Sequence, residues 1–357
     1  MSGRTRPDPS TWRRLAVLAP NWIGDAVMSE PAIRAVREAC PALEIVAIGR
    51  AAPLVAYAGH PAIGETLALD DRGLLGPWTV GRRVAATGAD AILLLRGSFR
   101  SALVARASGI GVRIGVDRDG RRPLLTHPVP RPDRDDRPRP TLALYAALVD
   151  TLGVEVAADA TPRIHPPAAE RQRAESLLAT LPRPILGMVP GGSKVPKRWP
   201  PDRFAEVARR CRDRIGGVAL FGGPEERAIL AAVARAVGDD GPPVIDLSSS
   251  GMALSTLPAA IGVCDALLTN DTGPRHLAIA QDLPVISLFG PTDHRWTIVP
   301  GAREDMLLAE PFLDDEHIAD RHPAACRIER IPVDDVVHAV HALPGFAAPD
   351  RGVSSDA

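Results

Sequence analysis

The sequence predicts an α/β protein built of two doubly wound, Rossmann-like domains that face each other across a cleft. Short apolar runs alternate with amphipathic stretches along most of the chain, as in βα units of parallel sheets. The same alternation starts again after the middle of the chain. The 357 residues, 45% of them apolar, are enough for two cores. We expect domains at residues 1–165 and 166–343, and a disordered tail at 344–357.

Composition excludes several classes of function. A formal net charge of −1 lacks the basic excess with which nucleic-acid-binding proteins neutralise phosphates. No run approaches the ~20 apolar residues that a transmembrane helix needs, and the N-terminus has no apolar core typical of a secretion signal. We therefore expect a cytoplasmic protein that could still touch the inner face of a membrane. The cysteines have no metal-like spacing and fit a reducing compartment: Cys40, Cys211, Cys264 and Cys326.

In the first half, residues 15–19 form the first expected strand, because five apolar residues precede a turn. A helix is expected to begin near Pro31, since proline fits the first helical position. Residues 116–140 are rich in arginine, aspartate and proline and predict a long irregular segment. The remaining expected strands are 44–48, 66–69 and 91–95, and the remaining helices are 98–107 and 141–152.

A helix at 168–181 is expected to lead into the second set of βα units. Its strands are apolar runs bounded by glycine, proline or polar residues, and its helices carry one apolar face. The expected strands are 185–189, 217–221, 244–247, 266–269 and 285–289; the expected helices are 201–213, 224–237, 253–263, 274–281 and 333–343.

Ligands of doubly wound domains bind beyond the carboxyl ends of the strands, so motifs that follow strands are the candidates for chemistry. The first motif, APNWIGDAVMSEP, places Asp25 after strand 15–19. A carboxylate at that edge could act as a general base, or it could merely cap the following helix, as aspartate commonly does.

The second motif, MVPGGSKVPKRWPPDRF, follows strand 185–189. Its glycines expose backbone N–H groups, Ser193 adds a hydroxyl, and nearby cations that could receive an anion are Lys194, Lys197 and Arg198. The spacing is not that of a Walker A loop. The alternative is a solvated glycine- and lysine-rich turn.

The third motif is LLTNDTGPRHLAIAQDLPVISLFGPTDHRW. Its expected turn comprises Asn270, Asp271, Thr272 and Gly273, ahead of a helix that carries Arg275 and His276. Free N–H groups at a helix start could seat a diphosphate, with His276 as a further donor. The alternative is an ordinary turn and a buried histidine with satisfied hydrogen bonds.

Two weaker candidates remain, and one class of enzyme is disfavoured. Glu225 or Glu226, after strand 217–221, could hold a ribose, although a first-turn glutamate stabilises any helix. An acidic acceptor could be bound by Arg100, Arg121 and Arg122, but the neighbouring aspartates fit a solvated loop equally well. A nicotinamide oxidoreductase is disfavoured, because neither half has GxGxxG after its first strand.

Together the segments NWIGDAVMSEPAIRAVR, GGSKVPKRWPPDRFAEVA and NDTGPRHLAIAQDLPVISLFGPTD resemble glycosyltransferase family 9, the ADP-heptose:lipopolysaccharide heptosyltransferases, most closely its heptosyltransferase II-like branch. The resemblance runs from about residue 14 to residue 343. It implies the GT-B fold, with an acceptor-binding N-terminal domain and a nucleotide-sugar-binding C-terminal domain. It also implies inverting transfer of heptose from ADP-heptose, which is a co-substrate, without a cofactor or metal.

The resemblance also implies roles for matching residues. Asp25 corresponds to the base that deprotonates the acceptor, and Lys197 stabilises the departing diphosphate. The implied donor-binding residues are Ser193, Lys197, Glu225, Met252, Asp271, Thr272, Gly273 and His276.

Two departures concern the acceptor. Only Cys326 follows the GPTD turn, where many heptosyltransferase II-like members have several cysteines, and the arginine-rich segment is atypical. A lipopolysaccharide inner core, another cell-surface glycan and a natural product all remain open as acceptors. A sugar-nucleotide-binding protein without transferase activity is the alternative from another class.

Overall fold

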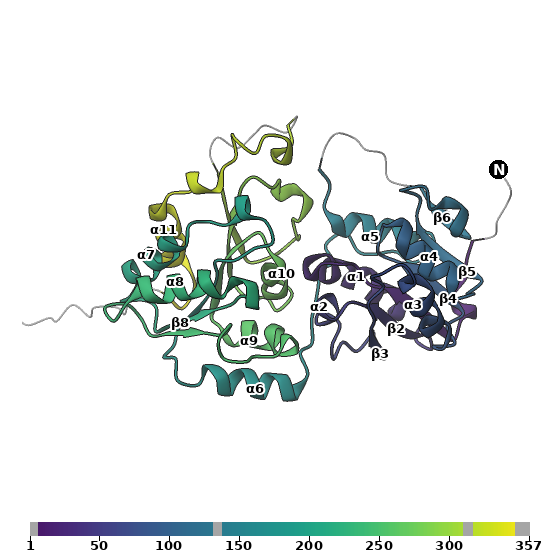
Figure 1. The fold of residues 1–357 in the computed structure, drawn as a ribbon, viewed down its shortest axis with the longest axis horizontal. Coiled ribbons are helices and arrows are strands. Elements are labelled where there is room, and N and C mark those ends of the chain that lie inside the picture. The colour runs from purple at the N-terminus through teal and green to yellow at the C-terminus, as the bar shows by residue number, and fades with distance from the viewer. Residues whose placement is uncertain (1–5, 131–137, 310–316, 347–357) are drawn as a thin grey trace, which may run out of the picture. The chain divides into compact units, whose positions relative to one another are not determined.

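The computed structural model describes residues 6–130, 138–309 and 317–346. It divides into two compact units (Figure 1). Unit 1 comprises Met1–Pro167 and His294–Ala302, and unit 2 comprises Ala168–Asp293 and Arg303–Ala357. The chain thus returns briefly to unit 1 at residues 294–302, which the sequence analysis did not anticipate. In the described part of the chain, no helix is both long and apolar enough to cross a membrane.

Unit 1 is built on a six-stranded parallel sheet with the order β3-β2-β1-β4-β5-β6. Its strands are β1 (Arg14–Leu18), β2 (Glu44–Gly49), β3 (Glu65–Ala68), β4 (Ala91–Leu94), β5 (Val112–Val116) and β6 (His127–Val129). Its helices are α1 (Ile23–Ala39), α2 (Ala51–Leu54), α3 (Gly76–Ala85), α4 (Phe99–Ala107) and α5 (Thr141–Asp150), with short 3-10 turns at Pro9–Thr11, Arg122–Leu124 and His294–Trp296.

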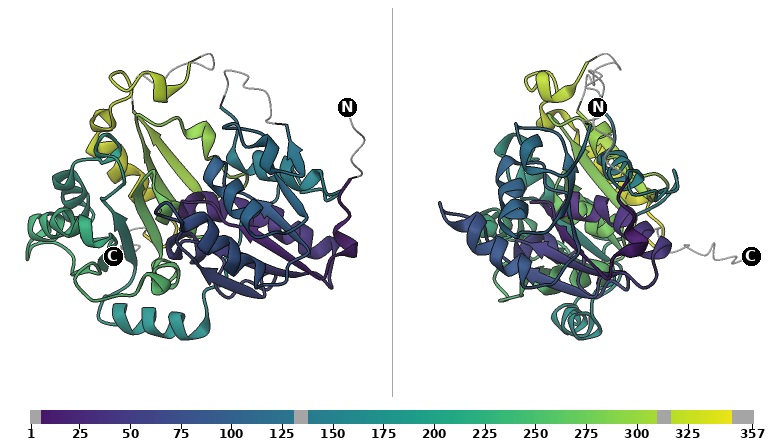
Figure 2. Two further views of the ribbon diagram at one scale, coloured as in Figure 1. Left: turned by 45° about the vertical axis from the view of Figure 1, so that its right-hand side comes forward. Right: turned by 90° about the vertical axis from the view of Figure 1, so that its right-hand side faces the viewer.

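Unit 2 repeats this topology, with the sheet order β12-β11-β10-β7-β8-β9. The parallel course of β11 and β12 is visible in the yellow-green strands of Figure 2. Its strands are β7 (Ile185–Val189), β8 (Gly217–Leu220), β9 (Val244–Asp246), β10 (Ala266–Asn270), β11 (Val285–Phe289) and β12 (Glu304–Leu308). Its helices are α6 (Ala168–Leu178), α7 (Pro201–Arg210), α8 (Arg227–Val237), α9 (Leu257–Val263), α10 (Gly273–Ile279) and α11 (Val333–Ala342), with 3-10 turns at Val195–Lys197, Pro224–Glu226, Leu254–Thr256, Ala319–Arg321 and Ile328–Arg330.

Both sheets have the doubly wound strand order 3-2-1-4-5-6 when each unit is numbered from its own first strand. The central strands β1, β7, β10 and β11 are buried along nearly their whole length, because helices cover both faces of a parallel sheet. The strand order reverses between β1 and β4 in unit 1, and between β7 and β10 in unit 2. The loops that leave those strands are therefore the expected ligand-binding positions.

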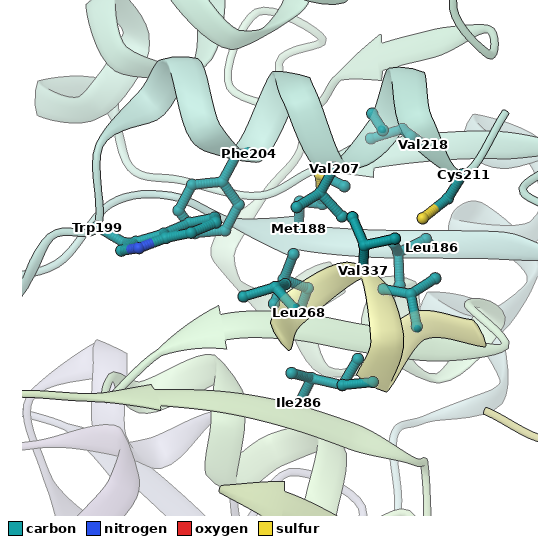
Figure 3. Packing of buried hydrophobic residues seen from close by; sticks show 14 of the residues in the cluster. Leu186, Met188, Trp199, Phe204, Val207, Cys211, Val218, Leu268, Ile286 and Val337 are labelled. Carbon is teal, nitrogen blue, oxygen red and sulfur yellow. The ribbon is translucent and has the colours of Figure 1, made fainter. Parts of the chain in front are cut away.

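The core of unit 2 lies between α7, α11 and the sheet (Figure 3). Trp199, which is 0% exposed, stacks edge-on against Phe204 and donates its indole N–H to the carbonyl of Ile331 at 3.1 Å. This anchors the segment that follows β7. Phe346 is also 0% exposed in this core, so the ordered chain extends beyond the expected limit at residue 343. The remainder of the expected tail, from residue 347, lies outside the described residues.

Two expectations for unit 1 were wrong. Helix α1 begins at Ile23, eight residues before Pro31, which lies inside it. The first turn contains Asp25, and the positive end of the helix dipole stabilises its negative charge. The irregular segment expected at 116–140 contains β6, which pairs with β5. Residues 131–137 of that segment lie outside the described residues.

A buried charged cluster ties α1 to the end of unit 1. Glu30 is 0% exposed; its carboxylate accepts from Arg34 Nε at 2.8 Å and from the backbone N–H of Arg163 at 2.9 Å. His60 accepts from the N–H of Ala62 at Nδ1, so its proton lies on Nε2, which donates to Glu30 at 2.9 Å. Arg34 also donates to the carbonyl of Thr161. The helix that carries Asp25 is thereby fixed to the segment that leads into unit 2.

We predict that Glu30→Ala lowers the free energy of unfolding of unit 1 by about 2–4 kcal/mol, because the buried N–H of His60 loses its acceptor and Arg34 loses a charge-assisted hydrogen bond. Urea unfolding measures this loss. Glu38→Ala is the matched control on the same helix, since Glu38 is 65% exposed and lies 3.8 Å from Arg34; an exposed pair contributes about 0–1 kcal/mol. Equal losses in the two variants would contradict the structural importance of the cluster.

Candidate active site

The loop after β7 is held in one conformation by Glu226. The backbone N–H of Gly192 donates to Glu226 Oε1 at 2.6 Å, and Arg198 Nε donates to the carbonyl of Gly192 at 2.7 Å. A Cβ atom on Gly191 would lie 2.1 Å from the Glu226 carboxylate, so a larger residue there would displace this carboxylate from the loop. The Glu226 carboxylate also accepts from the N–H of Gly223 at 2.8 Å. Glu226 therefore supports the loop.

Asn270, the last residue of β10, joins this loop to the neighbouring strand. Its side chain is fully buried and donates to the carbonyls of Pro190 and Gly191 at 3.0 and 2.9 Å. Its Oδ1 accepts from the N–H of Trp199 at 3.2 Å. Neither residue was predicted to organise the loop: Asn270 was expected in a turn, and Glu226 was considered only as a ribose ligand. The available signal for Asn270 was a polar side chain closing an otherwise apolar strand.

Lys197 and Asp271 form an ion pair beside this junction. Lys197 Nζ lies 2.8 Å from Asp271 Oδ2, and their side chains are 21% and 9% exposed. Burial pushes the pKa of Asp271 upward, but the charge and hydrogen bond of Lys197, with Arg275 and His276, outweigh it and hold the pKa below its ordinary value. Asp271 is thus ionised at neutral pH and orients the ammonium group. The structure brings together two residues that lie 74 positions apart.

His276 lies in the same electrostatic environment. It is 4% exposed, and burial, followed by the charge of Arg275, lowers its pKa to about 3. Its Nε2 lies 3.4 Å from Arg275 Nη1. Because arginine only donates, the proton of the neutral ring lies on Nδ1, which makes no hydrogen bond with any described residue. His276 therefore presents a buried, unused N–H donor.

Arg275 fixes the helix that carries His276. Its guanidinium is 0% exposed and binds both carboxylate oxygens of Glu304 on β12, at 2.6 and 2.7 Å. Ser287 on β11 also accepts from Arg275 Nε, at 3.2 Å. This bidentate pair is geometrically specific and attaches α10 to the sheet.

The other residues expected to bind the donor lie at several places in unit 2. Thr272 is the N-cap residue of α10, which begins at Gly273. Ser193 is exposed on the loop after β7, and Glu225 is exposed at the start of the Pro224–Glu226 turn. Met252 is half-buried and lines an open hollow of about 710 Å³ together with residues of α6. That volume lies within the range of small-molecule sites.

In unit 1, Asp25 follows β1 at the point where the strand order reverses. It is half-buried in the first turn of α1, whose N-cap residue is Trp22. The alternative that Asp25 is the cap is therefore wrong. Burial raises the pKa of Tyr57 and of Tyr145, and the charge of Asp25 adds to both shifts. The carboxylate thus lies near two buried, neutral phenols.

The three arginines expected to bind an acceptor are placed differently. Arg121 is 0% exposed; its guanidinium donates to the carbonyls of Val116 and Arg96, and burial lowers its pKa to about 10. Arg121 is buried within the fold, and the structure gives it no route to an acceptor in solution. Arg100 donates to the carbonyls of Asp71 and Gly73 and is 39% exposed. Arg122 is 68% exposed and lies 2.5 Å from Asp117.

Among residues 6–130, 138–309 and 317–346, no group of three or more histidine, cysteine, aspartate or glutamate side chains is arranged to hold a metal ion. The arrangement in unit 2 instead offers an ammonium group, a neutral imidazole N–H and a rigid glycine-containing loop. These are groups that bind a phosphorylated ligand.

We predict that His276 makes the stability of unit 2 depend on pH. Its pKa in the folded state, about 3, lies below the ordinary value of 6.5, so the unfolded chain binds the proton first as pH falls. The free energy of unfolding should therefore fall by about 2 kcal/mol from this group between pH 7 and pH 5. Urea unfolding at several pH values should show a shallower dependence for His276→Asn. His338→Asn, which removes an exposed imidazole from α11, should keep the wild-type slope; an unchanged slope in His276→Asn would contradict the assignment.

Comparison with known proteins places this arrangement in a family. The model of glycosyltransferase family 9 (heptosyltransferase) matches residues 78–312. The lipopolysaccharide heptosyltransferase 2 of Salmonella typhimurium is 27% identical over 303 residues, which cover 80% of this chain and 84% of that protein.

Two solved structures share the fold. The glycosyl transferase family 9 protein from Veillonella parvula has a TM-score of 0.82 at 23% identity, covering 96% of this chain and 99% of that one. The ADP-heptose lipopolysaccharide heptosyltransferase II of E. coli has a TM-score of 0.75 at 22% identity, covering 92% and 98%. The expected GT-B fold, with two Rossmann-like units, is confirmed. The chain belongs to glycosyltransferase family 9 (heptosyltransferase) and is a glycosyltransferase.

Proposed function

We propose that this protein transfers heptose from ADP-heptose to a saccharide acceptor of the lipopolysaccharide inner-core type, with inversion at the anomeric carbon and without a metal ion. The observation that carries the proposal is the Lys197–Asp271 pair beside the unused N–H of His276. These groups lie at the carboxyl ends of β7 and β10, where the strand order of unit 2 reverses. The Salmonella relative, a lipopolysaccharide heptosyltransferase by name, supports the sugar and the acceptor.

On the donor side, Lys197 binds the diphosphate of ADP-heptose while Asp271 keeps the ammonium group oriented. His276 donates its Nδ1 proton to a second oxygen of the donor, and Ser193, Thr272 and Gly273 line the same site. Negative charge grows on ADP as the bond between sugar and phosphate breaks. Preorganised donors stabilise that charge without reorganising during the reaction. Met252 and Glu225 contact the adenine and the ribose under this proposal.

On the acceptor side, Asp25 acts as the general base. The acceptor oxygen attacks the anomeric carbon on the face opposite ADP, its proton passes to the Asp25 carboxylate, and the bond to the diphosphate breaks. A single displacement of this kind inverts the anomeric centre and needs one base rather than a covalent intermediate. Unit 1 must present Asp25 to the donor held on unit 2. Because a lipopolysaccharide acceptor is anchored by lipid, the proposal includes contact with a membrane surface.

We predict that Asp25→Asn lowers kcat by at least about 100-fold, which is the lower range for removal of a general base. The measurement is release of ADP from ADP-heptose in the presence of heptose-deficient lipopolysaccharide. Binding of ADP-heptose by the variant should be unchanged, because the donor groups belong to unit 2. Glu38→Gln, an exposed carboxylate on the same helix, is the matched control and should retain activity. Undiminished turnover in Asp25→Asn would remove Asp25 as the base.

We predict that Lys197→Met weakens binding of ADP-heptose by about 10- to 100-fold, because a charge-assisted hydrogen bond contributes about 1.5–3 kcal/mol. Titration calorimetry measures this loss. Lys194→Met changes an exposed lysine of the same loop and should bind almost as the wild type does. UDP- and GDP-sugars should stabilise the wild type against heating less than ADP-heptose does; equal stabilisation by all three would contradict an adenine-specific site.

A further inference from the structure

Unit 1 exposes a cluster of large apolar side chains next to α3. Leu74, Leu75 and Trp78 are 92%, 74% and 52% exposed. With the exposed arginines Arg82 and Arg83 they form what we call the α3 face. Three such apolar residues within five positions are unusual on a surface that meets only water, because contiguous apolar area commonly marks an interaction site.

The orientation of α3 is fixed by its opposite side. Val80 and Val84 are buried, and a Cβ atom on Gly81 would lie 2.7 Å from Ala107 Cβ of α4. Helices α3 and α4 therefore pack closely in unit 1 (Figure 1). Leu75, Trp78 and Arg82 are spaced by three and four residues, so they share the outward side of the helix. Turning them inward would break the α3–α4 contact.

The loop that carries Leu74 is also held in place. Arg100 donates to the carbonyls of Asp71 and Gly73, directly before Leu74. The carboxylate of Asp71 in turn lies 3.1 Å from Arg96 Nη1, and both of these side chains are 6% exposed. The hydrogen bonds of the loop and the packing of α3 thus keep Leu74 and Leu75 exposed.

The positive charge of the α3 face indicates the kind of partner that it could contact. Residues 72–89 contain three arginines and neither aspartate nor glutamate. Arg72 is paired with Asp70 at 2.5 Å, whereas Arg82 and Arg83 extend from the last turn of α3. The outward side is therefore apolar toward the start of the helix and cationic toward its end. Apolar and aromatic side chains beside arginines are typical of helices that lie on anionic membranes.

We propose that the α3 face docks unit 1 on the surface of an anionic lipid bilayer. Leu74, Leu75 and Trp78 enter the headgroup region, where tryptophan is favoured, and Arg82 and Arg83 contact lipid phosphates. This extends the membrane contact of the proposed function to named residues, yet it requires neither donor nor turnover. Lipid binding and catalysis can therefore be tested separately.

The test is co-sedimentation of the full chain with phosphatidylcholine vesicles, with and without phosphatidylglycerol. We expect binding to the anionic vesicles, and a loss of at least about 10-fold in Leu74→Ser/Leu75→Ser/Trp78→Ser. Arg82→Gln/Arg83→Gln should lose about 30-fold in vesicle affinity at low salt, and its binding should depend less on salt.

The matched controls lie in unit 2. They are Leu254→Ser, at an exposed leucine, and Arg209→Gln/Arg210→Gln, at two adjacent arginines in the last turn of α7. Both should bind as the wild type does.

Three results would overturn the proposal: a wild type that fails to sediment with anionic vesicles, α3-face variants that bind as well as the wild type, or a wild-type dimer that these variants abolish. The dimer would make the α3 face an interface between copies of the chain.

Thermal unfolding checks that the variants remain folded. Turnover with an acceptor freed of its acyl chains should be unchanged in the variants. A wild type inactive toward every acceptor would count against the proposed function and leave the vesicle result intact.

Discussion

The buried amide of Asn270 is the interaction on which the site in unit 2 depends. It is the one side chain described here that binds the backbone on both flanks of the loop after β7, at Pro190 and Gly191 on one flank and Trp199 on the other. An amide can do this because it combines an acceptor with two donors, which neither a carboxylate nor an apolar residue offers. The segment between the two flanks contains Lys197. Its ammonium group can therefore meet Asp271, the next residue of the chain after Asn270.

Two cations of this site are each paired with a carboxylate, and its histidine is neutral. Arg275 is compensated by Glu304, Lys197 is compensated by Asp271, and His276 carries no charge at neutral pH. Burying an ion pair costs free energy, because both charges lose water. Separating the pair inside the protein costs more, because each charge is then buried without a partner, so each pair holds its members in position. Under the proposed function, the diphosphate accepts from a second N–H of the Lys197 ammonium group, which Asp271 already orients, so the ligand does not have to order a mobile lysine. The neutral His276 adds a donor without adding a charge that burial would oppose.

Much of the fold could be predicted from the sequence, and the reasons for failure are physical. Strands β7 and β11 have the predicted bounds, because proline or glycine flanks each apolar run. Helix α1 was placed too late because Pro31 was interpreted as a helix start, although a long helix anchored at Glu30 tolerates it. Strand β6 was missed because three residues within an arginine- and proline-rich segment carry no periodicity. The supporting roles of Glu226 and Asn270 were not predicted, because their hydrogen-bond partners lie up to 80 positions away along the chain.

The parallel topology of the first sheet brings the proposed base and the proposed docking surface to one edge of unit 1. All strands of the first sheet are parallel, so the segments after β1, β3 and β4 emerge at the same edge. Asp25 follows β1, and Leu74 follows β3, which is two strands or about 10 Å away across the sheet. Arg100, after β4, contacts the loop of Leu74 directly. If the α3 face rests on lipid, the edge that carries Asp25 also lies close to the membrane. A saccharide extending from a lipid anchor then reaches the base without leaving the surface that holds it.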